Sequence, residues 1–276
     1  MWVQGLTLTH EGKILKTKEF QKVAQQLLPC LPNWFIKGPF VYASPTQHIL
    51  RGLCFEGSGF DSATFYVTVF FLPLCVPTKI VGLTFGKRLR GEQGTAWNKH
   101  DPNLIPELRM AITREALPFL SEVESLPDLA RIVAAMYSLK SPYARQAIAY
   151  ALTSSGQLEA ANTQLEQLLE MLDNTVSWQR DMAERAAVLK SQLTNPQAAQ
   201  QQLRIWEMES RRNLMLDLGQ ELLAASLETV SSCCAPTLPM LGGQIDPRSA
   251  CGICSIKRAV QIGRHSAKRR THNCRA

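Results

Sequence analysis

The spacing of the apolar residues changes from strand-like to helical near residue 103, and that change limits the folds open to this chain. Before it, short runs rich in Phe, Val, Ile and Tyr are separated by turn residues at intervals of about ten to fifteen positions. After it, apolar residues recur every three or four positions, as on one face of a helix. A sheet followed by a run of helices is typical of an α+β fold, not of alternating βαβ winding.

The first part of the chain is expected to contain one helix and then a sheet. An apolar stripe over residues 17–28 predicts the helix, which Pro29 and Pro32 would end. With no helix between them, the following runs predict a meandering antiparallel sheet. These runs cover residues 34–43, 47–56, 62–76 and 79–89, and a loop over residues 91–103 is expected to follow.

The second part is expected to be helical, as a bundle or an array of hairpins. Six apolar stripes begin near Leu104, Leu129, Ala144, Leu158, Trp178 and Pro196. The last is expected to run to about Leu227, with Gly219 as a weak point. The predicted organisation is a helix-plus-sheet subdomain at 1–103, an all-helical subdomain at 104–232 and a basic, Cys-rich tail at 233–276.

The formal net charge of +7 comes entirely from residues 235–276. That segment holds eight basic residues and one acid, Asp246, so the rest of the chain is neutral. It is rich in Pro, Gly, Cys and Arg and shows neither helical nor strand periodicity. We expect this segment to be a disordered extension or a translated read-through. Its positive charge is therefore left out when the function of the neutral body is considered.

The tail also carries two patterns with chemical meaning. Cys251 and Cys254 have the spacing of a zinc knuckle, but no second tight pair stands at a recognised distance, so we predict neither metal nor cofactor. Basic residues at 257–258 and 268–270 could neutralise phosphates. Because residues 235–276 contain no aromatic residue to stack on bases, nucleic-acid binding through the tail remains an alternative only.

No catalytic motif is visible in the body, and no catalytic, cofactor-binding or metal-binding residue is predicted. The chain has neither a G-x-x-x-x-G-K-[ST] phosphate loop nor a G-x-G-x-x-G sequence after a strand. Gly57-Ser58-Gly59 is interpreted as a turn, and Asp101 as the cap of the following helix. Glu122 and Glu124 are two positions apart and would not share a helix face. We therefore expect a protein that is not an enzyme.

The location expected from the sequence is the cytoplasm, without membrane contact. Residues 1–10 show no secretory signal pattern, and the apolar run 63–77 is too short to span a bilayer and is interrupted by Pro73. Cys30, Cys54 and Cys75 lie in apolar segments and are interpreted as reduced core thiols.

Three stretches carry a resemblance: Phe70-Phe71-Leu72-Pro73-Leu74, residues 82–97 with Trp97, and Ala116-Leu117-Pro118-Phe119-Leu120. Together they resemble a group of small uncharacterised bacterial α+β proteins, some of them immunity proteins of toxin systems. The resemblance covers about residues 15–170 and transfers no functional residue. Residues 143–172 separately resemble one tetratricopeptide-like helical hairpin, but no second copy stands at a 34-residue period, so a generic helical hairpin is the favoured interpretation.

The function expected is therefore binding. An immunity protein occludes its toxin stoichiometrically through a complementary surface and needs no catalytic group. We expect a protein–protein interaction protein, with a bacterial immunity-type inhibitor of a toxin as its specific form, whose partner contacts the outer face of the sheet or the loop 91–103. The alternative is a nucleic-acid-associated accessory protein that acts through its tail.

Overall fold

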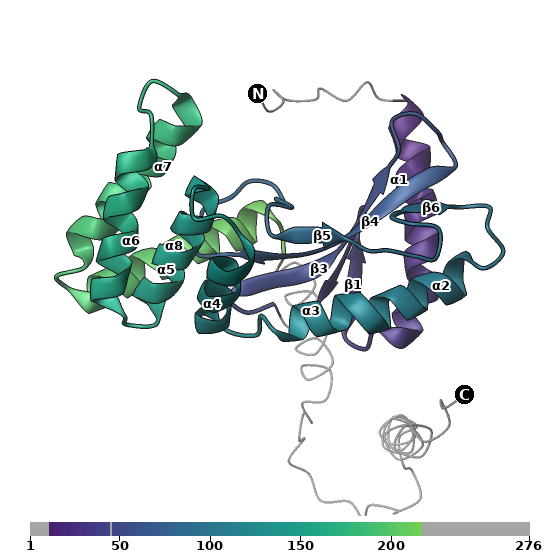
Figure 1. Ribbon diagram of the computed structural model, residues 1–276, viewed down its shortest axis with the longest axis horizontal. Helices are drawn as coiled ribbons and strands as arrows, with labels where there is room; N and C mark the ends of the chain where they lie inside the picture. The colour runs from purple at the N-terminus through teal and green to yellow at the C-terminus, as the bar shows by residue number, and fades with distance from the viewer. Residues whose placement is uncertain (1–10, 45, 217–276) are drawn as a thin grey trace, which may run out of the picture. The chain divides into compact units, whose positions relative to one another are not determined.

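The structure is a computed structural model that describes residues 11–44 and 46–216, with side chains from residue 18 onward. Helix α1 (Glu11–Leu27) and the short 3₁₀ helix η1 (Leu28–Cys30) come first and lead into an antiparallel sheet (Figure 1). Helices follow the sheet, so the predicted α+β order is confirmed. The strands are β1 (Trp34–Lys37), β2 (Phe40–Ala43), β3 (Ile49–Gly57), β4 (Thr64–Pro73), β5 (Gly86–Arg88) and β6 (Ala96–Asn98).

The sheet is the predicted meander. Strands β1 to β4 pair in sequence order, and the turn at Gly38-Pro39 splits the run 34–43 into the hairpin β1–β2. Strands β5 and β6 share the other edge of β4 end to end. Strand β5 lies opposite Thr68–Phe70 and β6 lies opposite Thr64–Tyr66.

Two predictions around this edge were wrong in detail. Of the run 79–89, only Gly86–Arg88 is a strand, because the preceding loop is fastened to α8 instead of to β4. The backbone of Thr78 donates to Ser210 Oγ at 3.2 Å, and its carbonyl accepts from Asn213 Nδ2 at 3.0 Å. The predicted loop 91–103 contains β6, which forms because Trp97 is buried beside its strand partner Phe65.

Seven helical segments follow the sheet in the described residues. The first two α-helices after the sheet are joined by a π-helical turn that ends just before Pro118. Proline lacks an N–H and, in a regular α-helix, would clash with the carbonyl four residues earlier, so the helix is irregular at this point. The segments are α2 (Leu104–Ala111) with the π turn η2 (Ile112–Ala116), α3 (Leu117–Ser121), α4 (Leu126–Met136), α5 (Pro142–Ser154), α6 (Leu158–Met171), α7 (Ser177–Gln192) and α8 (Pro196–Asn213).

The last four helices form a cycle of neighbours, and α4 also packs against α5. Helix α6 packs against α5 and α7, and α8 packs against α7 and α5. Such a cycle of neighbours is typical of a four-helix bundle, whereas a stacked repeat array contacts only along its length. Helices α5 and α6 form the hairpin expected at residues 143–172, joined through Gly156 at φ +76°. Its tetratricopeptide-like character stays a prediction.

Helix α8 ends earlier than predicted, at Asn213 instead of about Leu227. Met215 takes the left-handed conformation (φ +50°), and its N–H bonds to the carbonyl of Arg212, while Leu216 N–H bonds to that of Arg211. These two bonds form a Schellman motif, which satisfies the last carbonyls and turns the chain. Glycine usually occupies the left-handed position, so Met215 gave no sequence signal.

One cluster of buried apolar residues runs from the sheet into the helices. It joins α1, one face of β3 and β4, and all the later helices, with Leu53, Val69, Leu108 and Leu165 among its members. The described residues all fall within one compact unit. The subdomain boundary at residue 103 stays a prediction, and the predicted disordered tail 233–276 lies outside the described residues.

Candidate functional site

The sheet has two chemically different faces. Side chains alternate along a strand, so odd-numbered residues of β3 and β4, such as Leu53 and Val69, join the large core with α1 to α4. Even-numbered residues, among them Leu50, Cys54 and Phe70, form a second and smaller cluster on the opposite side. We call this second side the outer face.

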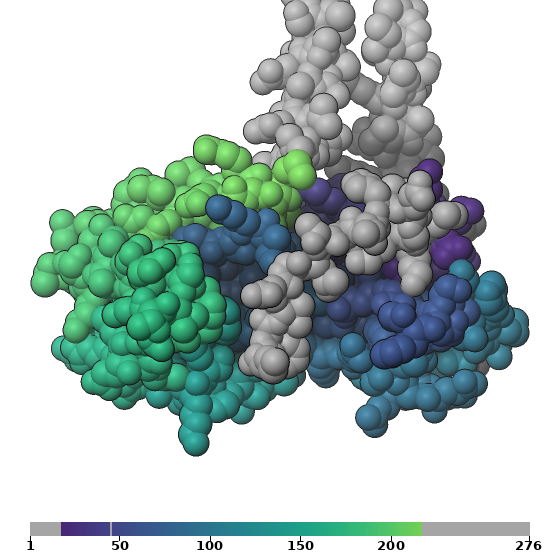
Figure 2. Space-filling model, turned by 90° about the horizontal axis from the view of Figure 1, so that it is seen from above, coloured from purple at the N-terminus to yellow at the C-terminus, as the bar shows by residue number. Residues whose placement is uncertain are grey.

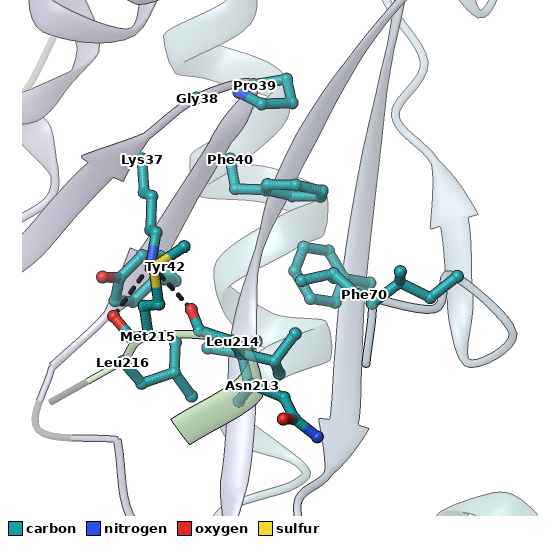
Figure 3. Close-up of a pocket in the computed structure, with 13 residues that line it drawn as sticks. Lys37, Gly38, Pro39, Phe40, Tyr42, Phe70, Asn213, Leu214, Met215 and Leu216 are labelled. Carbon is teal, nitrogen blue, oxygen red and sulfur yellow. Dashed lines mark hydrogen bonds between the residues drawn. The ribbon is translucent and has the colours of Figure 1, made fainter. Parts of the chain in front are cut away.

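The outer face holds an apolar groove (Figure 3). Its volume is about 460 Å³, which lies within the range of roughly 300–1,000 Å³ found for ligand pockets. The hairpin β1–β2 lines one side, the residues after α8 line another, and β3 and β4 contribute Leu50 and Phe70. The lining residues are Lys37, Gly38, Pro39, Phe40, Tyr42, Leu50, Phe70, Ile80, Val81, Asn213, Leu214, Met215 and Leu216.

Lys37 of β1 fixes the wall that follows α8. Its ammonium Nζ donates to the carbonyl oxygens of Leu214 at 2.7 Å and of Met215 at 2.8 Å (Figure 3). A cation is favourable at this position because the carbonyls at a helix C-terminus carry partial negative charge. Burial lowers the pKa of Lys37 below its ordinary value. In the space-filling view, the yellow-green end of α8 meets the dark blue surface of the first strands (Figure 2).

Polar bonds hold α8 beside the groove. Ser210 is fully buried and satisfied, since its hydroxyl donates to the carbonyl of Val76 at 3.1 Å and accepts from Thr78. The guanidinium of Arg211 donates to the carbonyls of Thr46 at 2.7 Å and Gln47 at 3.1 Å. These bonds position Leu214, which is buried in the outer-face cluster.

A close approach of backbone and ring shapes the middle of the groove. Gly52 lies opposite Phe70 across β3 and β4. A Cβ at Gly52 would stand 2.6 Å from the carbonyl oxygen of Val41 and 3.2 Å from the ring of Phe70. Only glycine leaves the ring of Phe70 in place at this position, so the shape of the groove depends on it.

Two apolar side chains that line the groove are exposed. Ile80 is 74% exposed and Met215 is 53% exposed. Exposed apolar side chains at a groove are typical of interaction sites on soluble proteins.

The outer face becomes polar beyond Cys54. Thr68 Oγ1 donates to Glu56 Oε2 at 2.7 Å, and the guanidinium carbon of Arg88 lies 3.9 Å from the ring centroid of Tyr66. An apolar centre with a polar border is the usual composition of a protein-binding surface.

The two buried cysteines are poor nucleophiles. Burial raises the pKa of Cys54 to about 12, with a smaller contribution from Glu56. Burial likewise raises the pKa of Cys75 to about 12, with a smaller contribution from Glu207. The thiolate is the reactive form, so neither thiol is activated near neutral pH. Cys30 is exposed in η1, so its interpretation as a core thiol was wrong.

The structure places the other residues considered from the sequence at separate points. Gly57 ends β3, while Ser58 and Gly59 begin the connection to β4, where Ser58 Oγ accepts from the N–H groups of Phe60 and Asp61. Asp101 Oδ1 accepts from the backbone of Asn103, which is an Asx turn before α2 and not the predicted cap. Glu122 and Glu124 are exposed between α3 and α4.

His48 and three of the tryptophans lie at separate places in the structure. His48 Nδ1 lies 2.8 Å from Glu207 Oε2 at the exposed edge of α8. Trp97 and Trp206 are buried, and Trp206 stacks on Tyr150 with ring centroids 5.4 Å apart. Trp178 is half-exposed and stacks on Tyr143 at 5.3 Å.

Within residues 18–44 and 46–216, no three His, Cys, Asp or Glu side chains stand close enough to hold a metal ion together. Among the helices of the described part of the chain, none combines the length and apolar character needed to cross a membrane. Cys251, Cys254 and the basic residues of the tail lie outside the described residues, so the structure tests neither the prediction that this tail binds no metal nor the alternative of nucleic-acid binding.

The sequence predicted a contact surface on the outer face of the sheet or at the loop 91–103, which stays a prediction, and it did not indicate the residues of the groove. Alternation in β3 and β4 could have separated the two faces, whereas Lys37, Ile80 and Met215 are brought together by contacts distant in sequence. Comparison with protein-family models, with curated proteins and with solved structures gave no match.

Proposed function

We propose that this chain is a cytoplasmic, non-catalytic protein-interaction protein whose groove on the outer face binds a segment of a partner protein. The observation that carries the proposal is the apolar groove with Ile80 and Met215 exposed at its border. Burial of apolar surface contributes about 25 cal/mol per Å² removed from water. A partner that covers these side chains therefore gains affinity at this place.

The geometry favours an apolar side-chain anchor in the partner. The only charged lining residue is Lys37, and its ammonium is already bound to the carbonyls after α8. The polar border formed by Glu56, Thr68 and Arg88 can then orient the partner through hydrogen bonds.

A bacterial immunity-type inhibitor is the specific form of this function that we propose. Such a protein acts by forming a one-to-one complex that blocks the site of a toxin, and complementary surface is all it requires. The groove would supply the apolar centre of that complex.

Affinity capture with matched variants tests the proposal. The full-length tagged chain is expressed in its native host, and the proteins retained are quantified by mass spectrometry for wild type, Ile80→Lys and Phe60→Lys. Both side chains are exposed and apolar, but Phe60 lies in the β3–β4 turn, away from the groove-lining residues.

The expected result is a stoichiometric partner retained by wild type and Phe60→Lys and depleted by about tenfold or more with Ile80→Lys, since hot-spot residues cost at least about 2 kcal/mol. Equal retention by all three chains, or no stoichiometric partner at all, would count against the proposal. Co-expression with the product of the neighbouring reading frame tests the immunity form, which requires a one-to-one complex.

A further inference from the structure

Strand β1 forms one edge of the described sheet, where it pairs with β2 alone. In antiparallel pairing, alternate residues of a strand bond to the same neighbour. Phe55 N–H bonds to the carbonyl of Pro39, so odd-numbered residues of β2 face β3 and its even-numbered residues face β1. Ser44 N–H accordingly bonds to the carbonyl of Asn33. The odd-numbered residues of β1 thus bond to β2, and the N–H and C=O of Ile36 point away from it.

The described parts of the chain leave these outward groups without a partner. Within residues 11–44 and 46–216, no group bonds to the N–H or the carbonyl of Ile36, or to the carbonyl of Trp34. Helix α1 lies on the other side of the sheet, since the ring of Phe20 contacts that of Phe55 at 6.1 Å in the large core. An edge strand with unpaired N–H and C=O groups is a template for a further strand.

The opposite edge of the sheet is better protected than β1. It is divided between β5 and β6, which have three residues each, and β5 carries Lys87 and Arg88. Short strands and charged side chains hinder the addition of another strand. The four residues of β1 include one charge, Lys37, and its ammonium is turned to the carbonyls after α8 (Figure 3). Its charge therefore does not guard the edge.

The edge of β1 and the groove form one continuous surface. Phe35 lies on the outer face of β1 and is 45% exposed. Its ring centroid is 6.3 Å from that of Tyr42, which lines the groove. A strand added beside β1 places every second side chain on this outer face. Directly opposite side chains have Cβ atoms about 4.5–5.5 Å apart, so one of them would contact Phe35.

We propose that the partner segment binds as an extended β-strand that pairs with the free edge of β1 and directs alternate apolar side chains toward Phe35 and the groove. The proposal rests on the proposed function, because the groove receives side chains of the same segment. A helical segment satisfies its own backbone groups and would leave those of Ile36 unpaired. In strand addition, backbone bonds supply affinity and pockets for alternate side chains supply specificity.

N-methylated peptides test the extended conformation. Peptides are selected from a random phage-displayed library on the full-length chain, and the tightest binder is synthesised with one backbone N–H methylated at a time. Fluorescence anisotropy measures the affinity of each peptide. Methylation at every second position should weaken binding by about tenfold, because only alternate N–H groups face β1. Methylation at the positions between them should have little effect.

Two variants at one position test the edge itself. Ile36→Pro and Ile36→Ala both shorten the side chain, but only proline removes the outward N–H. Proline is tolerated in an edge strand where its nitrogen faces solvent. Ile36→Pro should bind the selected peptide about tenfold or more weakly than Ile36→Ala. Urea denaturation checks that both fold. If Ile36→Pro does not fold, exchange of the Ile36 amide in wild type replaces it and should slow about tenfold or more when the peptide is bound.

Several results would overturn the strand pairing. These are the selection of no peptide, methylation effects without alternation, equal binding by Ile36→Pro and Ile36→Ala, and an Ile36 amide whose exchange the peptide leaves unchanged. A wild-type dimer in sedimentation velocity that Ile36→Pro dissociates would also overturn it, since a second copy would then occupy the edge.

Ile80→Lys separates failure of this proposal from failure of the proposed function, with Phe60→Lys as its control. If Ile80→Lys abolishes peptide binding but methylation shows no alternation, strand pairing is wrong and the groove stands as the binding site. If methylation alternates and Ile36→Pro weakens binding, but Ile80→Lys binds as well as Phe60→Lys, the strand pairing stands and the groove fails.

Discussion

Lys37 Nζ lies 2.7 Å from the carbonyl oxygen of Leu214, although the two residues are 177 positions apart in the sequence. This hydrogen bond, with a second one to the carbonyl of Met215, ties the first strand of the sheet to the end of the last described helix. Both residues line the groove on the outer face, so these two hydrogen bonds fix one of its walls.

Replacing Lys37 should therefore loosen the end of α8. We expect Lys37→Met to lower the free energy of unfolding by about 1 kcal/mol, since two hydrogen bonds from a partly exposed charged donor are lost. Urea denaturation measures the change. Lys22→Met, at an exposed position of α1, serves as the control and should stay within about 0.5 kcal/mol of wild type. Equal stability of the two variants would contradict the role given to Lys37.

Gly52 should be irreplaceable beside Phe70. The Cβ of Gly52→Ala would meet the carbonyl of Val41 and the ring of Phe70, so we expect a loss of about 1–3 kcal/mol from overpacking. Gly59→Ala is the matched control, because a Cβ there meets no atom within 4 Å. Thermal or urea unfolding of both variants checks the difference, and a Gly52→Ala protein as stable as the control would show that the ring moves aside freely.

Trp206 should contribute far more to stability than Trp178. Trp206 packs on buried Tyr150 and fastens α8 to α5, so Trp206→Ala should cost about 3–5 kcal/mol. Trp178 stacks on Tyr143 but is half-exposed, so Trp178→Ala should cost only about 1 kcal/mol. Similar losses in the two variants would mean that the bundle does not position α8.

The described cysteines should differ in reactivity. At pH 8, iodoacetamide should modify exposed Cys30 well before Cys54 and Cys75, whose pKa values are raised to about 12 by burial. Peptide mapping by mass spectrometry measures the order of modification. Early modification of Cys54 in the native protein would show that the outer face opens.

The same two thiols give stability a pH dependence. Their ordinary pKa is 9.0, so between pH 9 and the raised folded value the unfolded chain releases protons that the folded chain keeps. Stability from this source is complete below pH 9 and falls as the pH rises above it. The free energies of unfolding of wild type and Cys75→Ser, measured by denaturation, should therefore become more similar as the pH rises through this range. A difference that does not change with pH would contradict the raised pKa of Cys75.

Local patterns were sufficient to predict much of the fold. Neighbouring residues alone determine the alternation of apolar side chains in β4 and the start of α4 near Pro127-Asp128. The sheet and most helices could therefore be predicted from the sequence. Such elements form because their own apolar face and capping groups agree with the tertiary structure.

The site could not be predicted in the same way. The end of α8 depends on Lys37, and the irregular course of residues 79–85 depends on Ser210 and Asn213, so neither has a local signal. Met215 adopts a conformation that a sequence pattern assigns to glycine. The groove is made from these long-range contacts and therefore appeared only in the structure.

Amide hydrogen exchange of the full-length chain, alone and with its captured partner, tests the central claim most directly. The claim predicts added protection at the β1–β2 turn, at residues 78–83 and at residues 213–216, which surround the groove. The turn between β3 and β4 should be unchanged. Protection confined to α6 and α7, or the absence of any change around the groove, would contradict the assignment of the outer face as the binding site.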